Sequence, residues 1–219
     1  MITLKQYQQR TLTALERYLT LARIVGPKEA FEKVVKEDPT DRQPQVYRHR
    51  WGLQDVPYIC LRLPTGGGKT LLASHAVRIA ASNFMERDFP FVLWLVPTNM
   101  IRQQTAEALK NPSHPYREAL NDAFGQGKVA VFDIEDINNI CPKDVSDKVC
   151  VVLATMQTLR VSESNKEARK VYGHNENFES HFKALPNIAP GLDREGGTPQ
   201  GQVLYSFVNL LHQLRPLVI

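Results

Sequence analysis

The sequence predicts a doubly wound α/β fold, in which helices cover both faces of a mostly parallel sheet. Three apolar runs, at residues 56–63, 91–96 and 149–154, are typical of buried strands. They are apolar throughout rather than at every second position, which favours strands with helices on both faces. Each is followed by a helix-like segment or by a helix start, and this alternation of strand and helix indicates a parallel sheet.

The other expected elements can be placed along the chain in order. An amphipathic helix is expected over residues 3–23, and a short helix near 29–37 precedes a proline-broken loop. Helices should follow the first two apolar runs, at 69–83 and 100–110. Further elements are a helix over 115–124, a strand over 128–132, a helix over 202–214 and a strand that begins at Pro216.

Two regions are expected. Residues 1–55 should form an N-terminal helix with a linker, and residues 56–219 should form the main domain. Residues 160–200 are polar and then rich in glycine and proline, so they predict a long insert in that domain.

Composition narrows the class of protein. Hydrophobic residues at 42% and charged residues at 23% are ordinary for a globular protein, and the net charge of +4 favours an anionic partner only weakly. Cys60 and Cys150 lie in apolar runs, where a free thiol behaves as a small core residue, and no cysteine pair has zinc-ligand spacing. Neither a signal peptide nor an apolar run of membrane-spanning length is present, so we expect a cytoplasmic protein.

The most informative motif is Leu-Pro-Thr-Gly-Gly-Gly-Lys-Thr at residues 63–70, between a predicted strand and a predicted helix. Glycines let the backbone curl so that its N–H groups face inward, and the helix N-terminus adds partial positive charge. The motif departs from the strict phosphate-loop pattern, whose first glycine would fall on Leu63. The expected nucleotide-binding residues are Pro64, Thr65, Gly66, Gly67, Gly68, Lys69 and Thr70.

Two of these residues have expected catalytic roles. Lys69 should stabilise the β- and γ-phosphates of ATP, and the Thr70 hydroxyl should ligate Mg²⁺. The competing interpretation is a glycine-rich turn with a chance Lys-Thr pair.

Phosphate-loop ATPases also need an acidic residue at the end of a neighbouring strand. Asp133 follows a strand of modest hydrophobicity and is one candidate, whereas the run at 149–154 ends in Thr155. The last strand stops at Ile219, where an acid would be expected to follow. The expectation is therefore a chain cut just before its acidic motif.

Three short motifs around the phosphate loop add a family resemblance. They are Leu-Lys-Gln-Tyr-Gln at residues 4–8, Val-Pro-Thr at 96–98 with Gln103-Gln104 after it, and Ala-Thr-Met-Gln-Thr-Leu at 154–159. With them, the chain resembles the first RecA-like domain of superfamily 2 helicases and translocases. More narrowly, it resembles the Res subunit of type III restriction enzymes, over most of residues 1–160 and 202–219.

The resemblance implies further site residues. Gln8 would read the adenine edge of ATP, because a side-chain amide pairs with adenine N6 and N7 together. Its alternative is an exposed glutamine on an amphipathic helix, and Thr98 could equally be an ordinary helix N-cap. The residues implied to contact a nucleic acid backbone are Pro97, Thr98, Gln104, Thr155 and Gln157.

The function implied is an ATP-driven DNA translocase or helicase motor that uses ATP and Mg²⁺. DNA is the expected partner, and a modification methyltransferase subunit would be a second one. Three alternatives stay open: a nucleotide-dependent adaptor, another superfamily 2 defence or RNA helicase, and a small-molecule kinase. A continuation into an acidic box and a second α/β domain would separate a motor from an adaptor, and a kinase would not need the Gln8 element.

Overall fold

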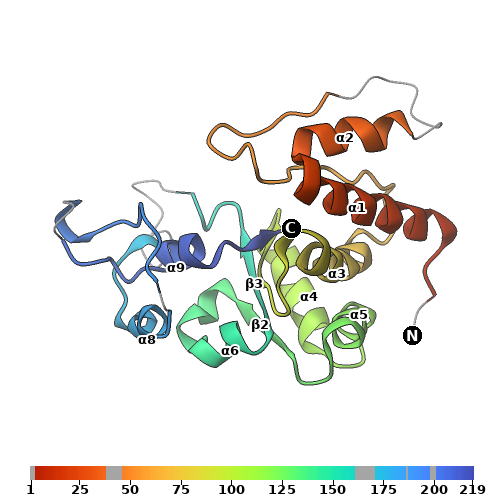
Figure 1. The fold of residues 1–219 in the computed structure, drawn as a ribbon. Coiled ribbons are helices and arrows are strands. Elements are labelled where there is room, and N and C mark those ends of the chain that lie inside the picture. Colours follow the sequence, from red (N-terminus) through yellow and green to blue (C-terminus); the bar gives the residue numbers. More distant parts are fainter. Residues whose placement is uncertain (1–2, 38–45, 161–170, 186, 198–200) are drawn as a thin grey trace.

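A single parallel sheet lies at the centre of the molecule (Figure 1). The computed structural model describes residues 3–37, 46–160, 171–185, 187–197 and 201–219. The strands are β1 (Phe91–Val96), β2 (Val129–Asp133), β3 (Val149–Thr155) and β4 (Leu217–Val218), in the order β2-β3-β1-β4. Every neighbouring pair is parallel, and helices cover both faces, so the predicted doubly wound α/β fold is confirmed.

One face of the sheet is covered by three helices. They are α3 (Lys69–Ala80), which continues into a π-helical turn (Ala81–Met85), α4 (Asn99–Lys110) and α5 (Pro115–Phe124). Alternate residues of β1 and β3, such as Val92 and Val151, point to this face. Helix bounds here agree with the sequence prediction to within a few residues.

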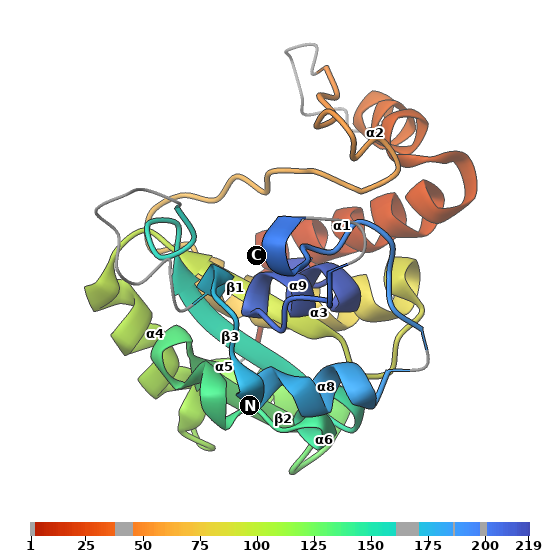
Figure 2. The ribbon, with the colours of Figure 1, turned by 90° about the vertical axis from the view of Figure 1, so that its left-hand side faces the viewer.

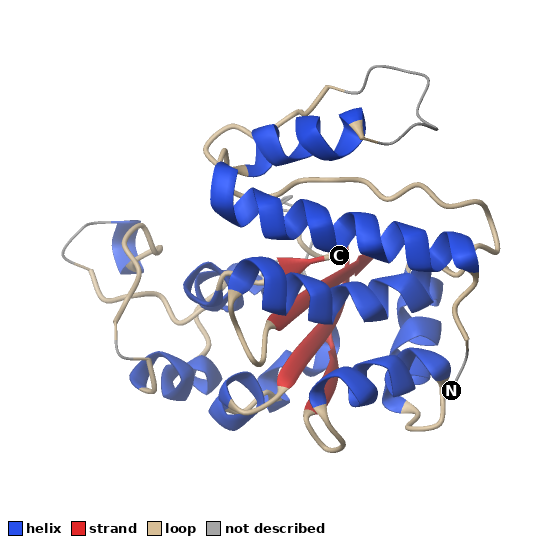
Figure 3. Cartoon of the chain, turned by 45° about the vertical axis from the view of Figure 1, so that its right-hand side comes forward, coloured by secondary structure: helices blue, strands red, loops and turns tan. Residues whose placement is uncertain are grey.

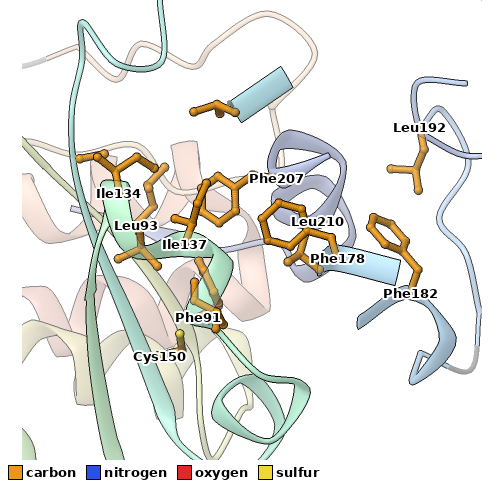
Figure 4. Packing of buried hydrophobic residues seen from close by; sticks show 14 residues of the cluster. Phe91, Leu93, Ile134, Ile137, Cys150, Phe178, Phe182, Leu192, Phe207 and Leu210 are labelled. Carbon is orange, nitrogen blue, oxygen red and sulfur yellow. The ribbon is translucent and has the colours of Figure 1, made fainter. Parts of the chain in front are cut away.

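Shorter helices cover the other face. They are α6 (Pro142–Ser146), α8 (Glu179–Lys183) and α9 (Phe207–Leu214), with 3-10 turns at Ile134–Asn139, Glu176–Phe178 and Glu195–Gly197. Figure 2 shows α8 and α9 in front of the sheet. Figure 4 shows Phe207 and Phe178 in the apolar cluster that these segments form with Phe91 and Leu93 of β1.

Part of the predicted polar insert at 160–200 forms helical turns and packs in the core. Val171, Phe178 and Phe182 are all less than 5% exposed and belong to the core of this second face. Polar composition concealed these residues, because they are spaced among charged and amide side chains. Residues 161–170, 186 and 198–200 lie outside the described part of the chain. The helix predicted over 202–214 begins only at Phe207, where the Ser206 side chain accepts the Asn209 N–H.

The N-terminal helix α1 (Gln6–Val25) packs on α3, and α2 (Pro27–Lys36) packs on the far side of α1 (Figure 3). Leu15, Tyr18 and Leu19 of α1 pack with Ala80 of α3, and Tyr47 closes this cluster. The boundary at residue 55 stays a prediction.

The strand predicted over residues 56–63 is wrong. These residues form an irregular extended segment, and Tyr58 and Leu61 are 52% and 37% exposed. β4 pairs with β1 and is the edge of the sheet, so no described strand pairs with residues 56–63. A hydrophobic sequence without a ladder partner stays irregular. Cys60 is consequently exposed rather than a core residue, whereas Cys150 is buried as predicted.

Because His181 is buried, we expect the free energy of unfolding to decrease in mild acid. Its ring is 3% exposed, and Nε2 lies 2.8 Å from the Ile140 carbonyl oxygen. Burial lowers the pKa of His181, although the Ile140 carbonyl and the Asp144 charge oppose that shift. A folded-state pKa below the unfolded value of about 6.5 means that the unfolded chain binds more protons. The free energy of unfolding that depends on His181 is therefore fully present above about pH 6.5 and declines as the pH falls.

The thermal unfolding midpoint should therefore decrease between about pH 7 and pH 5. His181→Gln, which keeps an N–H donor near the Ile140 carbonyl, should flatten this decrease. His75, whose pKa burial also lowers, contributes to the same window, so His75→Gln should be measured in parallel. The exposed His49→Gln is the control. An unchanged pH profile in His181→Gln would refute the assignment.

In the described part of the chain, no helix has the length and apolar character that a membrane span requires.

Candidate nucleotide and nucleic-acid site

The glycine-rich motif is placed at the carboxyl edge of the sheet. Lys69 opens α3, and α3 leads through the π-helical turn into the amino end of β1. The N-terminus of α3 therefore points toward the edge where the parallel strands end. Ligands of open α/β sheets bind outside this edge.

The glycines of the motif are required by the backbone. Gly66 and Gly68 have φ of 75° and 78°, in the left-handed region that glycine adopts most easily. A Cβ on Gly67 would lie 2.8 Å from the Pro64 carbonyl oxygen, which accepts the Gly67 N–H at 3.0 Å. The loop is thus a tight turn that requires positive φ at Gly66 and Gly68 and leaves no room for a side chain at Gly67.

The start of α3 has the features of an anion site. Gly68 is its N-cap and offers no side chain, and the first turn contains no acidic residue. The first N–H groups of a helix have no intrahelical partner, and the helix dipole adds positive charge there. Lys69 is exposed, and its ammonium donates to the Pro64 carbonyl at 2.9 Å. These residues fit a phosphate group, and Thr70, half-buried one position later, fits a Mg²⁺ ligand.

Gln8 contacts the glycine loop directly. Its Nε2 donates to the Gly67 carbonyl at 3.0 Å across 59 residues of sequence, and the Tyr7 hydroxyl donates to the same oxygen at 3.0 Å. Gln8 Oε1 accepts the Lys5 N–H at 2.8 Å. A Cβ on Gly68 would lie 2.6 Å from Gln8 Nε2.

Gln8 is therefore a buried residue, 6% exposed, and the alternative of an exposed surface glutamine does not hold. The Gln8 amide donates one hydrogen bond to Gly67 and accepts one from Lys5, and these two bonds fix it beside the loop. Its reading of adenine stays a prediction.

The two strand-end motifs lie side by side. Val96 of β1 is paired with Thr155 of β3 in the sheet register, so both chains leave the sheet at the same edge. Thr98 caps α4 by accepting the Ile101 N–H at 3.3 Å, as the alternative interpretation expected. Pro97, Thr98 and Gln104 are exposed.

Thr155 and Gln157 differ in accessibility. Thr155 is 3% exposed, and its hydroxyl lies 2.9 Å from the Thr158 hydroxyl. Gln157 is exposed on the turn that follows. In this structure the buried Thr155 hydroxyl stabilises the turn through Thr158. A contact with a nucleic acid backbone would come from the exposed neighbours of Thr155. Nucleic acid contacts by all these residues stay predictions.

A buried ion pair lies next to this edge, and sequence reasoning missed it. Arg102 of α4 is 4% exposed and donates to Asp133 at 2.6 Å and to Glu135. Asp133 also accepts the Glu135 N–H at 3.0 Å. Asp133 ends β2, which is separated from β1 by β3, and it is engaged by an arginine. Asp133, the candidate metal ligand, is therefore paired with Arg102. It lies at the end of β2, which is at the opposite edge of the sheet from β4.

A glycine loop at the start of a helix, at the carboxyl edge of a parallel sheet, defines the class of phosphate-loop nucleotide-binding proteins. Residues 1–183 match the family described as Type III restriction enzyme, res subunit, and the chain belongs to that family. No curated protein and no solved structure matched the chain. The family membership makes this a helicase-like ATP-binding domain of superfamily 2, a class of ATP-dependent hydrolases that generally use Mg²⁺.

Proposed function

We propose that this chain is the ATP-binding motor domain of a DNA translocase or helicase, the restriction subunit of a type III restriction-modification system. One observation carries the proposal: Gln8 donates to the Gly67 carbonyl, so the amide expected to read adenine lies beside the turn expected to bind phosphate. The family membership of residues 1–183 supports the restriction assignment. A modification methyltransferase subunit is the partner that this assignment implies.

The roles of the residues follow from their positions. Backbone N–H groups of residues 66–70 and the Lys69 ammonium would hold the phosphates of ATP, and the Gln8 amide would face adenine. The Thr70 hydroxyl would hold Mg²⁺, which neutralises charge that develops on the β- and γ-phosphates. The strand-end elements at Thr98 and Gln157 lie on the same edge of the sheet. A nucleotide-dependent change in the loop would therefore lie near the residues that we expect to contact nucleic acid.

The steady-state ATP hydrolysis rate of the natural protein tests this function. It should be measured without nucleic acid and with duplex DNA, single-stranded DNA and RNA. Stimulation by DNA supports the translocase, and stimulation by RNA alone would replace it with an RNA helicase. Residues 1–219 alone should bind ATP weakly and hydrolyse almost none, because among the described residues no carboxylate ends β1 or β3 to hold Mg²⁺, and Asp133 is bound by Arg102. Hydrolysis by residues 1–219 at an intact motor's rate would refute that expectation.

A second candidate is a nucleotide-dependent adaptor that uses ATP as a switch. One observation favours it: among the described residues, no carboxylate ends β1 or β3, and Asp133 is bound by Arg102. An adaptor would bind MgATP without turnover in every condition above. Nucleic acid stimulation of hydrolysis in the natural protein would exclude it.

A further inference from the structure

A loop ahead of the glycine motif exposes aromatic and basic side chains together. We call residues 46–58 the aromatic-basic loop; it is the orange segment beside α2 in Figure 1. Trp51 is 96% exposed and Tyr58 is 52% exposed. Arg48, His49 and Arg50 are exposed in the same loop, and Asp55 is its one acidic residue. An almost fully exposed tryptophan is unusual on a globular surface, because burial of its ring stabilises a protein strongly.

The loop is held in place from beneath. Tyr47 is 6% exposed, and its ring centroid lies 5.4 Å from that of Phe31 in α2. The Tyr47 hydroxyl accepts the Tyr58 N–H at 3.1 Å and donates to the Val56 carbonyl, so it ties the two ends of the loop together. Between these two ends the chain makes a turn, in which the Leu53 N–H donates to the Arg50 carbonyl oxygen at 3.0 Å. Trp51 therefore lies in a turn that these hydrogen bonds hold in place.

The side chains of the loop combine two kinds of chemistry. The Arg50 guanidinium lies 4.9 Å from the centroid of the Tyr58 ring and donates to its hydroxyl at 3.1 Å. Neither Arg48 nor Arg50 pairs with a carboxylate that the structure describes. The ring of Trp51 offers an open face to a planar ligand, and the arginines offer charge to an anion.

We propose that the aromatic-basic loop binds single-stranded nucleic acid, with a base stacked on Trp51 and phosphates held by Arg48 and Arg50. Stacking platforms with nearby cations are how proteins bind single strands without sequence preference. A duplex keeps its bases stacked inside and offers Trp51 no free base face. A purely apolar protein partner would leave both arginines without counter-charges, so the charge of the loop favours a polyanion.

This site is distinct from the strand-end motifs. The aromatic-basic loop is anchored on α1 and α2 through the cluster that contains Tyr47, whereas Thr98 and Gln157 follow β1 and β3 at the sheet edge. The inference does not require ATP hydrolysis. Single-strand binding by the loop can therefore be tested without nucleotide, apart from the proposed motor function.

Intrinsic tryptophan fluorescence gives a direct test. The chain has two tryptophans, Trp51 at 96% exposed and Trp94 at 4% exposed, so a quencher in solution reaches Trp51 preferentially. Titration of the chain with oligothymidine should quench this fluorescence, and Trp51→Phe should remove the quenching. Duplex DNA of equal length should quench much less. An oligouridine arm tells whether RNA binds as well as DNA.

Affinities should be measured in parallel by anisotropy of a labelled oligothymidine at two salt concentrations. Trp51→Ala should weaken binding about tenfold, since one stacked base contributes about 1–3 kcal/mol. Trp51→Phe should restore part of that loss. Arg48→Ala with Arg50→Ala should weaken binding further and reduce its salt dependence, because two phosphate contacts are lost. The matched controls are Ile188→Ala, another exposed apolar residue, and Lys143→Ala, which removes one surface charge.

Unchanged affinity in Trp51→Ala would overturn the proposal. Loss of affinity in Thr98→Ala and Gln104→Ala, with Trp51→Ala unaffected, would assign single-strand binding to the strand ends and leave the motor function standing. A blue-shifted Trp51 emission that grows with protein concentration, without nucleic acid, would show that a second copy covers the loop and would also overturn the proposal. Lys69→Ala should leave single-strand affinity unchanged.

Discussion

Lys69→Ala is expected to abolish ATP-dependent activity in the natural protein and to weaken MgATP binding by residues 1–219 about 10- to 100-fold. Hydrogen bonds to charged groups contribute about 1.5–3 kcal/mol, and Lys69 is the one lysine of the glycine motif. The side chain is exposed and bonds only the Pro64 carbonyl among its described partners. Its removal should therefore leave the fold intact. Isothermal titration with MgATP measures the binding loss, and circular dichroism checks the fold.

Lys143→Ala on α6 is the matched control, since it removes the same surface charge away from the loop. It should bind MgATP like the unmodified chain. If Lys69→Ala binds MgATP equally well, the glycine motif does not hold the phosphates. If Lys69→Ala unfolds, Lys69 has a structural role that its exposure does not indicate.

Arg102→Ala should lower the free energy of unfolding by about 3 kcal/mol, the lower end of the cost of breaking a buried ion pair. Arg102 and Asp133 are 4% and 14% exposed, so removal of the arginine leaves the half-buried Asp133 carboxylate without its partner. Glu135 is 62% exposed and returns to water at little cost. Urea denaturation, followed by far-UV circular dichroism, measures the difference.

The same helix supplies the control for this variant. Lys110 of α4 pairs with Asp136 at 3.7 Å, and both side chains are 48% exposed. Lys110→Ala should cost less than about 1 kcal/mol, because exposed ion pairs contribute little. Arg102→Ala combined with Asp133→Asn should recover part of the lost stability, since no buried charge then remains unpaired. Equal effects of Arg102→Ala and Lys110→Ala would contradict the role of burial.

The parts of the fold that could be predicted are those set by local pattern. β1 and β3 are continuously apolar because both of their faces are buried, so the sequence of each strand is enough to predict it. Residues 56–63 carry a similar pattern but form no strand, because a strand also requires a hydrogen-bonded neighbour. A neighbour is a property of the sheet, and the segment's own sequence does not reveal it.

The same division applies to the site. The glycine loop was predictable because its chemistry lies within consecutive residues, from Pro64 to Thr70. The contact of Gln8 with Gly67 spans 59 residues, and only the family resemblance connected the two. The pair of Arg102 and Asp133 spans 31 residues with no motif, so burial in the fold alone brings it together. The roles of Thr98 and Thr155 toward nucleic acid remain predictions.

A crystal structure of the chain with Mg²⁺ and a non-hydrolysable ATP analogue tests the central claim most directly. We expect the phosphates to lie against the backbone N–H groups of residues 66–70, with Mg²⁺ on the Thr70 hydroxyl and adenine beside Gln8. The Lys69 ammonium should leave the Pro64 carbonyl and contact the β- and γ-phosphates. A nucleotide bound elsewhere, or a Lys69 that still bonds Pro64 beside a bound nucleotide, would contradict the assignment of this loop as the ATP site.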